Sequence, residues 1–239
     1  MSVRLLHLSD THLSGPGAVP NFPDVDPVQR LEQVLNVVAP HAPFDVLVIT
    51  GDVCDDGSPD AARTVRDLVA PVAPAVFAVP GNHDHTDVIA DVFGAPEAEL
   101  GPWQLVGAAT NVPGQVAGIA APVVDALDTL DAIPSDRPAV VLAHHPLRSP
   151  STHEWFTLPD ADVLEQRLLR RTAPTVLLSG HTHQPCAARV GTARLLGAPS
   201  TWYGLRHDGP DWTVDVGLTG ARIVELFPDG AIATQVVSG

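Results

Sequence analysis

The sequence predicts an α/β fold in which two sheets pack between helices. Two observations lead to this prediction. The first third of the chain alternates short apolar runs with amphipathic stretches, and the remainder adds further apolar runs that end in polar clusters or turns. No internal repeat or linker divides the 239 residues. A chain of this length suits one α/β domain, so we expect a single domain over residues 1–239.

Three buried strands and two helices are expected in the first third of the chain. Apolar residues at helical spacing predict helices over 27–38 and 58–72, each with a proline in its first turn. Ser58 is expected to cap the second helix. The strands are residues 3–8, 46–49 and 76–79. This strand-helix alternation is typical of parallel sheets, which carry their sites at the carboxyl ends of the strands.

The second part of the chain is richer in strands. Helices are expected over 124–133 and 158–172, where apolar residues again recur at helical spacing. The remaining apolar runs are predicted as strands because they are short and bounded by turn residues. These strands are residues 103–112, 116–121, 139–143, 175–178, 193–196, 222–226 and 232–237.

Composition excludes several classes of partner. The 13 arginines stand against 28 acidic residues, a formal charge of −15, so a nucleic-acid polymer is not expected to bind. Two distant cysteines, Cys54 and Cys186, do not make a disulfide scaffold and are expected to be buried thiols. No apolar run is long enough for a membrane span, and the first residues lead directly into a strand. We therefore expect a cytoplasmic protein with no membrane partner.

Five of the predicted strands end in clusters of Asp, Asn and His. The clusters are Asp10-Thr-His12, Gly51-Asp52-Val-Cys-Asp55, Gly81-Asn82-His83-Asp84, His144-His145-Pro146 and Gly180-His181-Thr-His183. Each cluster alone could be a turn or a cap. Together, at the ends of buried strands, they supply carboxylates, an amide and neutral imidazoles, which are ligands for hard-to-borderline divalent metals. The sequence therefore predicts a metal site at this edge.

These motifs resemble those of the calcineurin-like metallophosphoesterases. The order D-x-H, G-D-x-x-D, G-N-H-D, H and G-H-x-H spans residues 10 to 183. The segments LSDTHL, GDVCDDG, GNHD, HHP and GHTHQP are similar to the motifs of the class III cyclic nucleotide phosphodiesterase branch of this family. The resemblance implies a four-layer α/β/β/α sandwich of the metallophosphoesterase type, with two mixed sheets flanked by helices.

The same resemblance implies two divalent or trivalent metal ions, Mn, Fe or Zn, bridged by Asp52. One ion would be held by Asp10, His12, Asp52 and His183, and the other by Asp52, Asn82, His144 and His181. Gly180 is expected to let the backbone turn tightly beneath the last two histidines. Substrate contacts are implied for Asn82 and His83, with His83 as general acid and Asp55 orienting it. For His145, a substrate contact and a supporting or merely buried role both stay open.

The implied activity is hydrolysis of phosphodiester bonds, first of all in 3′,5′-cyclic nucleotides such as cAMP. A metal-bridging hydroxide would attack phosphorus while His83 protonates the leaving oxygen. A nucleotide pyrophosphatase or phosphomonoesterase on the same core stays open. A non-catalytic scaffold is disfavoured because every motif position is filled. The expected partner is a small phosphodiester or nucleotide, and a homodimer stays open as the assembly.

Several residues near the motifs have two interpretations. Asp84 is expected to serve a turn or to support the ligands rather than bind a metal, and His7 to lie in the core. For another group, pocket lining and ordinary packing both stay open. This group is His85, Arg148, Trp202, Tyr203, Arg206 and His207.

Overall fold

The computed structural model describes residues 1–18, 25–132 and 137–239, which contain thirteen strands and five α-helices. The strands are β1 Val3–Leu8, β2 Val46–Thr50, β3 Val76–Val79, β4 Glu97–Leu100, β5 Trp103–Gly107, β6 Ala139–Leu142, β7 Thr175–Ser179, β8 Cys186–Val190, β9 Ala193–Gly197, β10 Gly204–Asp208, β11 Asp211–Asp215, β12 Gly220–Leu226 and β13 Ile232–Ser238. The helices are α1 Pro27–Val38, α2 Pro59–Val69, α3 Thr86–Phe93, α4 Ala121–Asp131 and α5 Ala161–Arg170, with short 3-10 turns η1 Ala39–His41 and η2 Glu154–Phe156.

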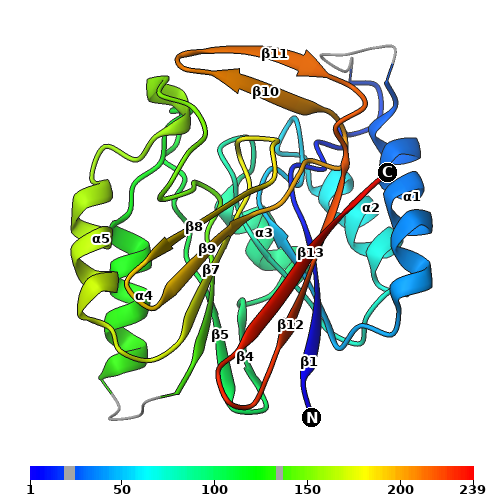
Figure 1. Cartoon of the computed structure of the whole chain (residues 1–239). Helices are drawn as coiled ribbons and strands as arrows, with labels where there is room; N and C mark the ends of the chain where they lie inside the picture. Colours follow the sequence, from blue (N-terminus) through cyan, green and yellow to red (C-terminus); the bar gives the residue numbers. More distant parts are fainter. Residues whose placement is uncertain (19–24, 133–136) are drawn as a thin grey trace.

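The strands form two mixed sheets and one separate hairpin. The first sheet has the order β13-β12-β1-β2-β3, and the second has the order β4-β5-β6-β7-β9-β8. In the first, β1, β2 and β3 run parallel, while β12 and β13 are antiparallel. In the second, β5, β6, β7 and β9 run parallel between two antiparallel edges. Hairpin β10–β11 lies across one end of both sheets (Figure 1).

The two sheets pack face to face, and helices cover their outer faces (Figure 1). Alternation along β2 shows how the layers arise. Leu47 and Ile49 pack against helices α1 to α3, while Val46 and Val48 join the core between the sheets. On the second sheet, Leu177 of β7 faces α4 and α5. This arrangement confirms the predicted four-layer α/β/β/α sandwich with two mixed sheets.

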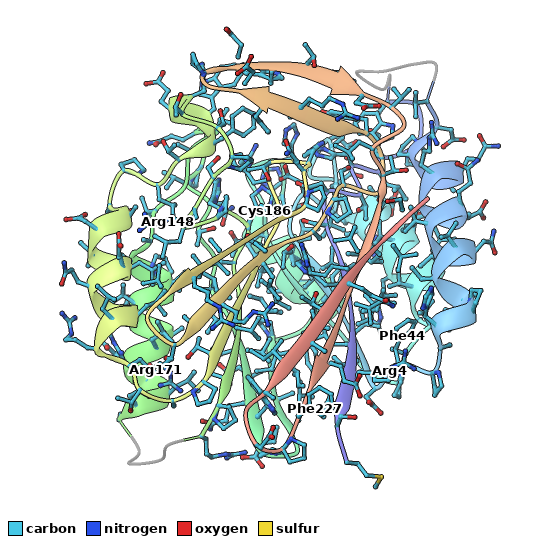
Figure 2. The ribbon with its side chains drawn as sticks, in the orientation of Figure 1. Arg4, Phe44, Arg148, Arg171, Cys186 and Phe227 are labelled. Atoms are coloured by element: carbon cyan, nitrogen blue, oxygen red, sulfur yellow. The ribbon has the colours of Figure 1, made fainter. Side chains whose placement is uncertain are left out.

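Local contacts fix the ends of these elements. Asp26 caps α1 by accepting from the backbone N–H of Val28 at 2.9 Å, and Ser58 caps α2 as predicted. Figure 2 shows Arg4 beside Phe44, with the guanidinium carbon 5.6 Å from the ring centre, where β1 meets the loop before β2. Arg171, at the end of α5, makes an ion pair with Asp131 of α4.

Several predicted elements differ from the structure. Residues 116–121 are not a strand, because the chain turns there and α4 begins at Ala121 with a proline in its first turn. The predicted strand 103–112 ends at Gly107. The predicted helix 124–133 corresponds to α4, and its last residue, Ile133, lies outside the described residues.

The longest helix among the described residues is α1, with 12 residues. A helix needs about 20 residues to cross a bilayer. None of the described helices is therefore long and apolar enough to span a membrane.

Candidate metal centre

The carboxyl ends of five parallel strands bring the motif residues to one edge of the two sheets. Three of these strands, β1, β2 and β3, belong to the first sheet, and β6 and β7 belong to the second. Parallel strands end at the same edge, so residues far apart in sequence meet there. The residues that follow these strands are Asp10 and His12, Asp52 and Asp55, Asn82 and His83, His144 and His145, and His181 and His183.

Left-handed backbone marks the predicted ligands. Among the described residues, the non-glycine positions with positive φ are Asp10, His12, Asp52, His181 and His183, with φ from 47° to 69°. This conformation is uncommon for residues with a Cβ and costs on the order of 1–3 kcal/mol each. Every one of these strained positions is a predicted metal ligand, so the backbone is held in the strain by the surrounding sheets.

Gly180 is required for a reason other than the predicted one. Its φ is not in the left-handed region, so backbone freedom does not explain it. A Cβ at this position would overlap the Ser9 hydroxyl and would lie 2.6 Å from an Asp10 carboxylate oxygen. Gly180 thus lets the loop of His181 approach the loop of Asp10, and the His181 N–H donates to Asp10 Oδ1 at 3.0 Å.

The first group of side chains comprises Asp10, His12, Asp52 and His183, whose ligand atoms lie within 4.8 Å of one another. The Nε2 atoms of His12 and His183 are 3.1 Å apart. His183 Nε2 lies 3.4 Å from Asp10 Oδ1, and His12 Nε2 lies 3.6 Å from Asp52 Oδ2. All four side chains are buried.

The hydrogen bonds of these histidines leave their ligand nitrogens free. His12 Nδ1 donates to Asp55 Oδ1 at 3.1 Å, and His183 Nδ1 donates to the Tyr203 carbonyl at 2.9 Å. Such bonds fix the tautomer with a lone pair on Nε2. Two lone pairs 3.1 Å apart repel unless a proton or a cation lies between them. A metal about 2.0–2.1 Å from each nitrogen fits this separation.

The second group comprises Asp52, Asn82, His144 and His181. His144 Nε2 lies 3.3 Å from Asp52 Oδ2, 3.1 Å from Asn82 Oδ1 and 3.2 Å from His181 Nδ1. The other ring nitrogens donate to backbone carbonyls, His144 Nδ1 to Thr50 and His181 Nε2 to Trp155, each at 2.7 Å. Asp52 Oδ2 therefore lies between the two groups of nitrogens.

Buried carboxylates make both groups attractive to positive charge. Burial raises the pKa of Asp10 to about 6. Burial alone would lower the pKa of His144, but the carboxylates of Asp52 and Asp10 outweigh it and raise that pKa to about 9. The pKa of His12 is also raised, since Asp55 and Asp52 outweigh its burial. No arginine lines the pocket among the described residues, so a bound cation would compensate these carboxylates.

His83 and Asp55 lie beside the first group. His83 Nδ1 is 3.1 Å from the Asp55 carbonyl and 3.4 Å from Asp55 Oδ1, and its backbone N–H donates to Asp52 Oδ1 at 2.9 Å. The His83 side chain is 35% exposed and lines the pocket. Because Nδ1 is held by Asp55, Nε2 is the nitrogen available to a ligand. Asp55 Oδ1 also accepts from His12, so one carboxylate orients both rings.

His145 and Asp84 are buried behind the ligands. His145 Nε2 donates to the Val116 carbonyl at 3.0 Å, and Nδ1 lies 2.8 Å from Thr110 Oγ1. Both ring nitrogens are used inside the protein, and His145 is outside the pocket lining, so this placement favours the buried, supporting role over the substrate contact. The carboxylate of Asp84 accepts from three backbone N–H groups of the metal-site loops, and supports them as expected. These groups belong to Val53, Cys54 and Gly81.

The structure also places the residues left open by the sequence. Tyr203 lines the pocket, and Trp202 is buried with its ring 5.4 Å from that of His12. The others make contacts within the protein. Arg148 pairs with Glu165, Arg206 pairs with Asp215, His207 donates to the Thr182 carbonyl, and His85 precedes α3.

Figure 2 shows Arg148 on the loop beside α5 and Cys186 at the start of β8. Cys54 is buried as expected, whereas Cys186 is partly exposed.

One side of the pocket was not foreseen from the sequence. Three aromatic side chains, Trp155, Phe156 and Trp212, line it together with the metal-ligand residues. Trp155 and Phe156 lie on η2 and Trp212 on β11. One feature of the sequence could have indicated this side of the pocket. The segment His153-Glu-Trp-Phe156, with two adjacent aromatic residues, follows the His144-His145-Pro146 motif.

Known proteins are similar to this sequence over nearly its whole length. The chain is 30% identical to the 3′,5′-cyclic adenosine monophosphate phosphodiesterase CpdA of Vibrio vulnificus, covering 98% of this chain and 89% of that protein. It is 32% identical to the protein of the same name from Pseudomonas aeruginosa, with the same coverage.

Solved structures share the fold at low identity. A dimetal phosphatase from Danio rerio superposes with a TM-score of 0.64 at 12% identity, covering 99% of this chain and 98% of that one. A purple acid phosphatase from yellow lupin superposes with a TM-score of 0.62 at 13% identity, covering 99% and 52%. The sequence profile of the Calcineurin-like phosphoesterase family matches residues 3–185. The chain therefore belongs to the calcineurin-like phosphoesterase family.

Proposed function

We propose that this protein hydrolyses small phosphodiesters, above all 3′,5′-cyclic nucleotides such as cAMP, at a centre of two metal ions. The observation that carries the proposal is the placement of Asp52 Oδ2 between two groups of ring nitrogens, 3.6 Å from His12 and 3.3 Å from His144. The substrate is inferred from the curated relatives, which bear the name cAMP phosphodiesterase and match 98% of this chain.

Each ion has a set of donors in this proposal. Asp10, His12, Asp52 and His183 hold one ion, and Asp52, Asn82, His144 and His181 hold the other. Carboxylate, amide and imidazole donors suit Mn, Fe or Zn. Two such ions, when bound, polarise the phosphate oxygens and activate a water for attack on phosphorus.

The remaining groups of the chain act on the substrate and on the ligands. Asn82 and His83 line the pocket and contact the phosphate, and His83 Nε2 donates a proton to the departing alkoxide oxygen. Asp55 holds the His83 ring through Nδ1. His145 is a positioning residue in this scheme, because it joins the loop of Thr110 and Val116 to the His144 loop.

The proposal treats residues 1–239 as one domain, supported by the pairing of β1 with β12 and of β12 with β13 in a single sheet. A cytoplasmic location, expected from the sequence, is tested by cell fractionation. The homodimer, which the sequence leaves open, is tested by size-exclusion chromatography of the purified chain.

The activity is tested with purified protein of known metal content and added Mn²⁺. Three substrates are compared: cAMP, bis(p-nitrophenyl) phosphate and p-nitrophenyl phosphate. We expect kcat/KM for the two diesters to exceed that for the monoester. A preference for the monoester would identify a phosphomonoesterase instead. Hydrolysis of ADP-ribose, with none of cAMP, would identify a nucleotide pyrophosphatase.

A further inference from the structure

The pocket above the metal ligands has two walls of different chemistry. Its volume is about 240 Å³. Its polar side carries predicted ligands such as Asn82 and His181. Its apolar side carries Trp155, Phe156 and Trp212, which we call the aromatic wall. The metal ligands account for phosphate binding, so the aromatic wall is available to the rest of the substrate.

The aromatic wall is assembled from two distant segments. The ring centres of Trp155 and Trp212 are 5.7 Å apart, and those of Phe156 and Trp212 are 5.4 Å apart. His153 packs edge-on against both tryptophans, with ring centres at 5.1 and 5.0 Å. These are ordinary distances for attractive aromatic pairs.

Backbone contacts hold hairpin β10–β11 against the segment that carries η2. The N–H of Thr152 donates to the Gly209 carbonyl at 2.9 Å, and the Ser151 hydroxyl donates to the same oxygen at 3.3 Å. Gly209 lies at the tip of the hairpin, between β10 and β11. The wall is therefore fixed before any ligand binds, which lowers the entropic cost of stacking.

The aromatic wall begins directly beside a metal ligand. The Trp155 carbonyl accepts from His181 Nε2 at 2.7 Å, and the Phe156 and His181 ring centres are 5.4 Å apart. In a cyclic nucleotide only the ribose separates the base from the phosphate. With the phosphate on the metal side of this pocket, the base would lie in the part lined by Trp155 and Trp212.

The chemistry of the wall fits a neutral, planar ring. Trp155 is 43% exposed, so a ligand that covers it gains apolar burial. The described lining residues include no arginine, so none of them would pair with a second phosphate. Stacking on aromatic faces tolerates every base, because each base has a π face.

We propose that Trp155, Phe156 and Trp212 form the nucleobase-binding wall and recognise the base by stacking. This inference rests on the proposed phosphodiesterase function. Because stacking depends on ring area, the wall accepts cyclic purine and pyrimidine nucleotides and binds the purines more tightly.

The test uses Trp155→Ala and Trp212→Ala, with Leu169→Ala as the matched control. Leu169 is an exposed apolar residue of α5 outside the pocket. Trp155→Ala keeps the carbonyl that orients His181. Three substrates are compared on metal-loaded enzyme: cAMP, cCMP and a base-free analogue, methyl riboside 3′,5′-cyclic phosphate.

We expect each tryptophan variant to raise KM for cAMP by about 5- to 150-fold, the effect of losing one stacking partner. The kcat for cAMP, and both constants for the base-free analogue, should stay within about twofold. The preference for cAMP over cCMP should shrink, and Trp155→Tyr should restore it. Equal losses on cAMP and on the base-free analogue would overturn the nucleobase wall, as would unchanged KM for cAMP. A wild-type enzyme that hydrolyses none of the three substrates would overturn the proposed function itself.

Discussion

The Nε2 atoms of His12 and His183 lie 3.1 Å apart, although the two residues come from opposite ends of the motif series and from different sheets. Both rings use Nδ1 to donate to oxygen, one to Asp55 and one to the Tyr203 carbonyl. The two lone pairs therefore converge on one point. Such convergence is costly in a buried site unless a positive charge lies between the two nitrogens. The arrangement of these histidines therefore favours the binding of a cation at this point.

Replacing His183 by Ala should remove one donor and lower both metal content and activity. We expect kcat/KM for cAMP to fall by more than about 100-fold, beyond the 10- to 100-fold that loss of an orienting partner costs. The matched control is His41→Ala, since His41 lies in η1 and contacts Gln235 far from the site. Metal analysis and kinetics of both variants check this; equal metal content and activity in the two would contradict the assignment of His183.

Replacing His83 by Gln should spare metal binding and affect leaving groups unequally. An alkoxide leaves poorly without a proton, whereas p-nitrophenolate needs none. We expect the turnover of cAMP to fall by about 10²–10⁴-fold and that of bis(p-nitrophenyl) phosphate by less than about tenfold. Steady-state kinetics on metal-loaded variant give both values. Parallel losses on the two substrates would exclude proton donation by His83.

Replacing Gly180 by Ala should destabilise the protein by steric overlap. The added Cβ would meet the Ser9 hydroxyl and the Asp10 carboxylate, and overpacking of this kind costs about 1–3 kcal/mol. We expect Tm to fall by roughly 2–12 °C. Gly114→Ala serves as the control, because its φ is +74° but no atom lies within 4 Å of the added Cβ. Thermal unfolding should show the smaller loss, about 1–2 kcal/mol from the left-handed backbone alone, for Gly114→Ala; the reverse order would rule out the close approach.

Removing the metals with a chelator should lower stability as well as activity. The buried carboxylates of Asp10 and Asp52 would lose their compensating charge. Each ion present at 100 times its Kd contributes about 2.7 kcal/mol, so Tm should drop by at least about 5 °C. Differential scanning fluorimetry with EDTA, followed by Mn²⁺ addition, measures the drop and its reversal. An identical Tm with and without chelator would mean that the folded chain holds no ion.

The sequence predicted which residues meet at this edge of the sheets, because that signal is local. Each ligand follows a short apolar strand, and strand ends can be recognised from a few residues, as at Val46–Thr50 before Asp52. Parallel strands then bring their ends together without further information. His145 was harder to predict, because its placement depends on contacts with the distant Thr110 and Val116.

Elements with weak local patterns were missed. Strand β8, Cys186–Val190, contains two alanines and an arginine, and such residues do not favour strands. Strand β11 alternates polar and apolar residues, but Leu205 is the one apolar side chain of β10, and the hairpin is not part of either large sheet. The aromatic wall was not predicted either, because it depends on a contact between segments that are distant in the sequence. Trp155 and Trp212 meet only because the hairpin folds onto the η2 segment.

The central claim is that Asp52 bridges two metal ions, and counting metals in wild type and Asp52→Asn tests it most directly. Inductively coupled plasma mass spectrometry on both proteins, with cAMP hydrolysis measured on the same samples, gives the answer. We predict two ions per chain in the wild type and, in the variant, clear loss of metal together with loss of activity. An Asp52→Asn protein that keeps two ions and full turnover would contradict the claim.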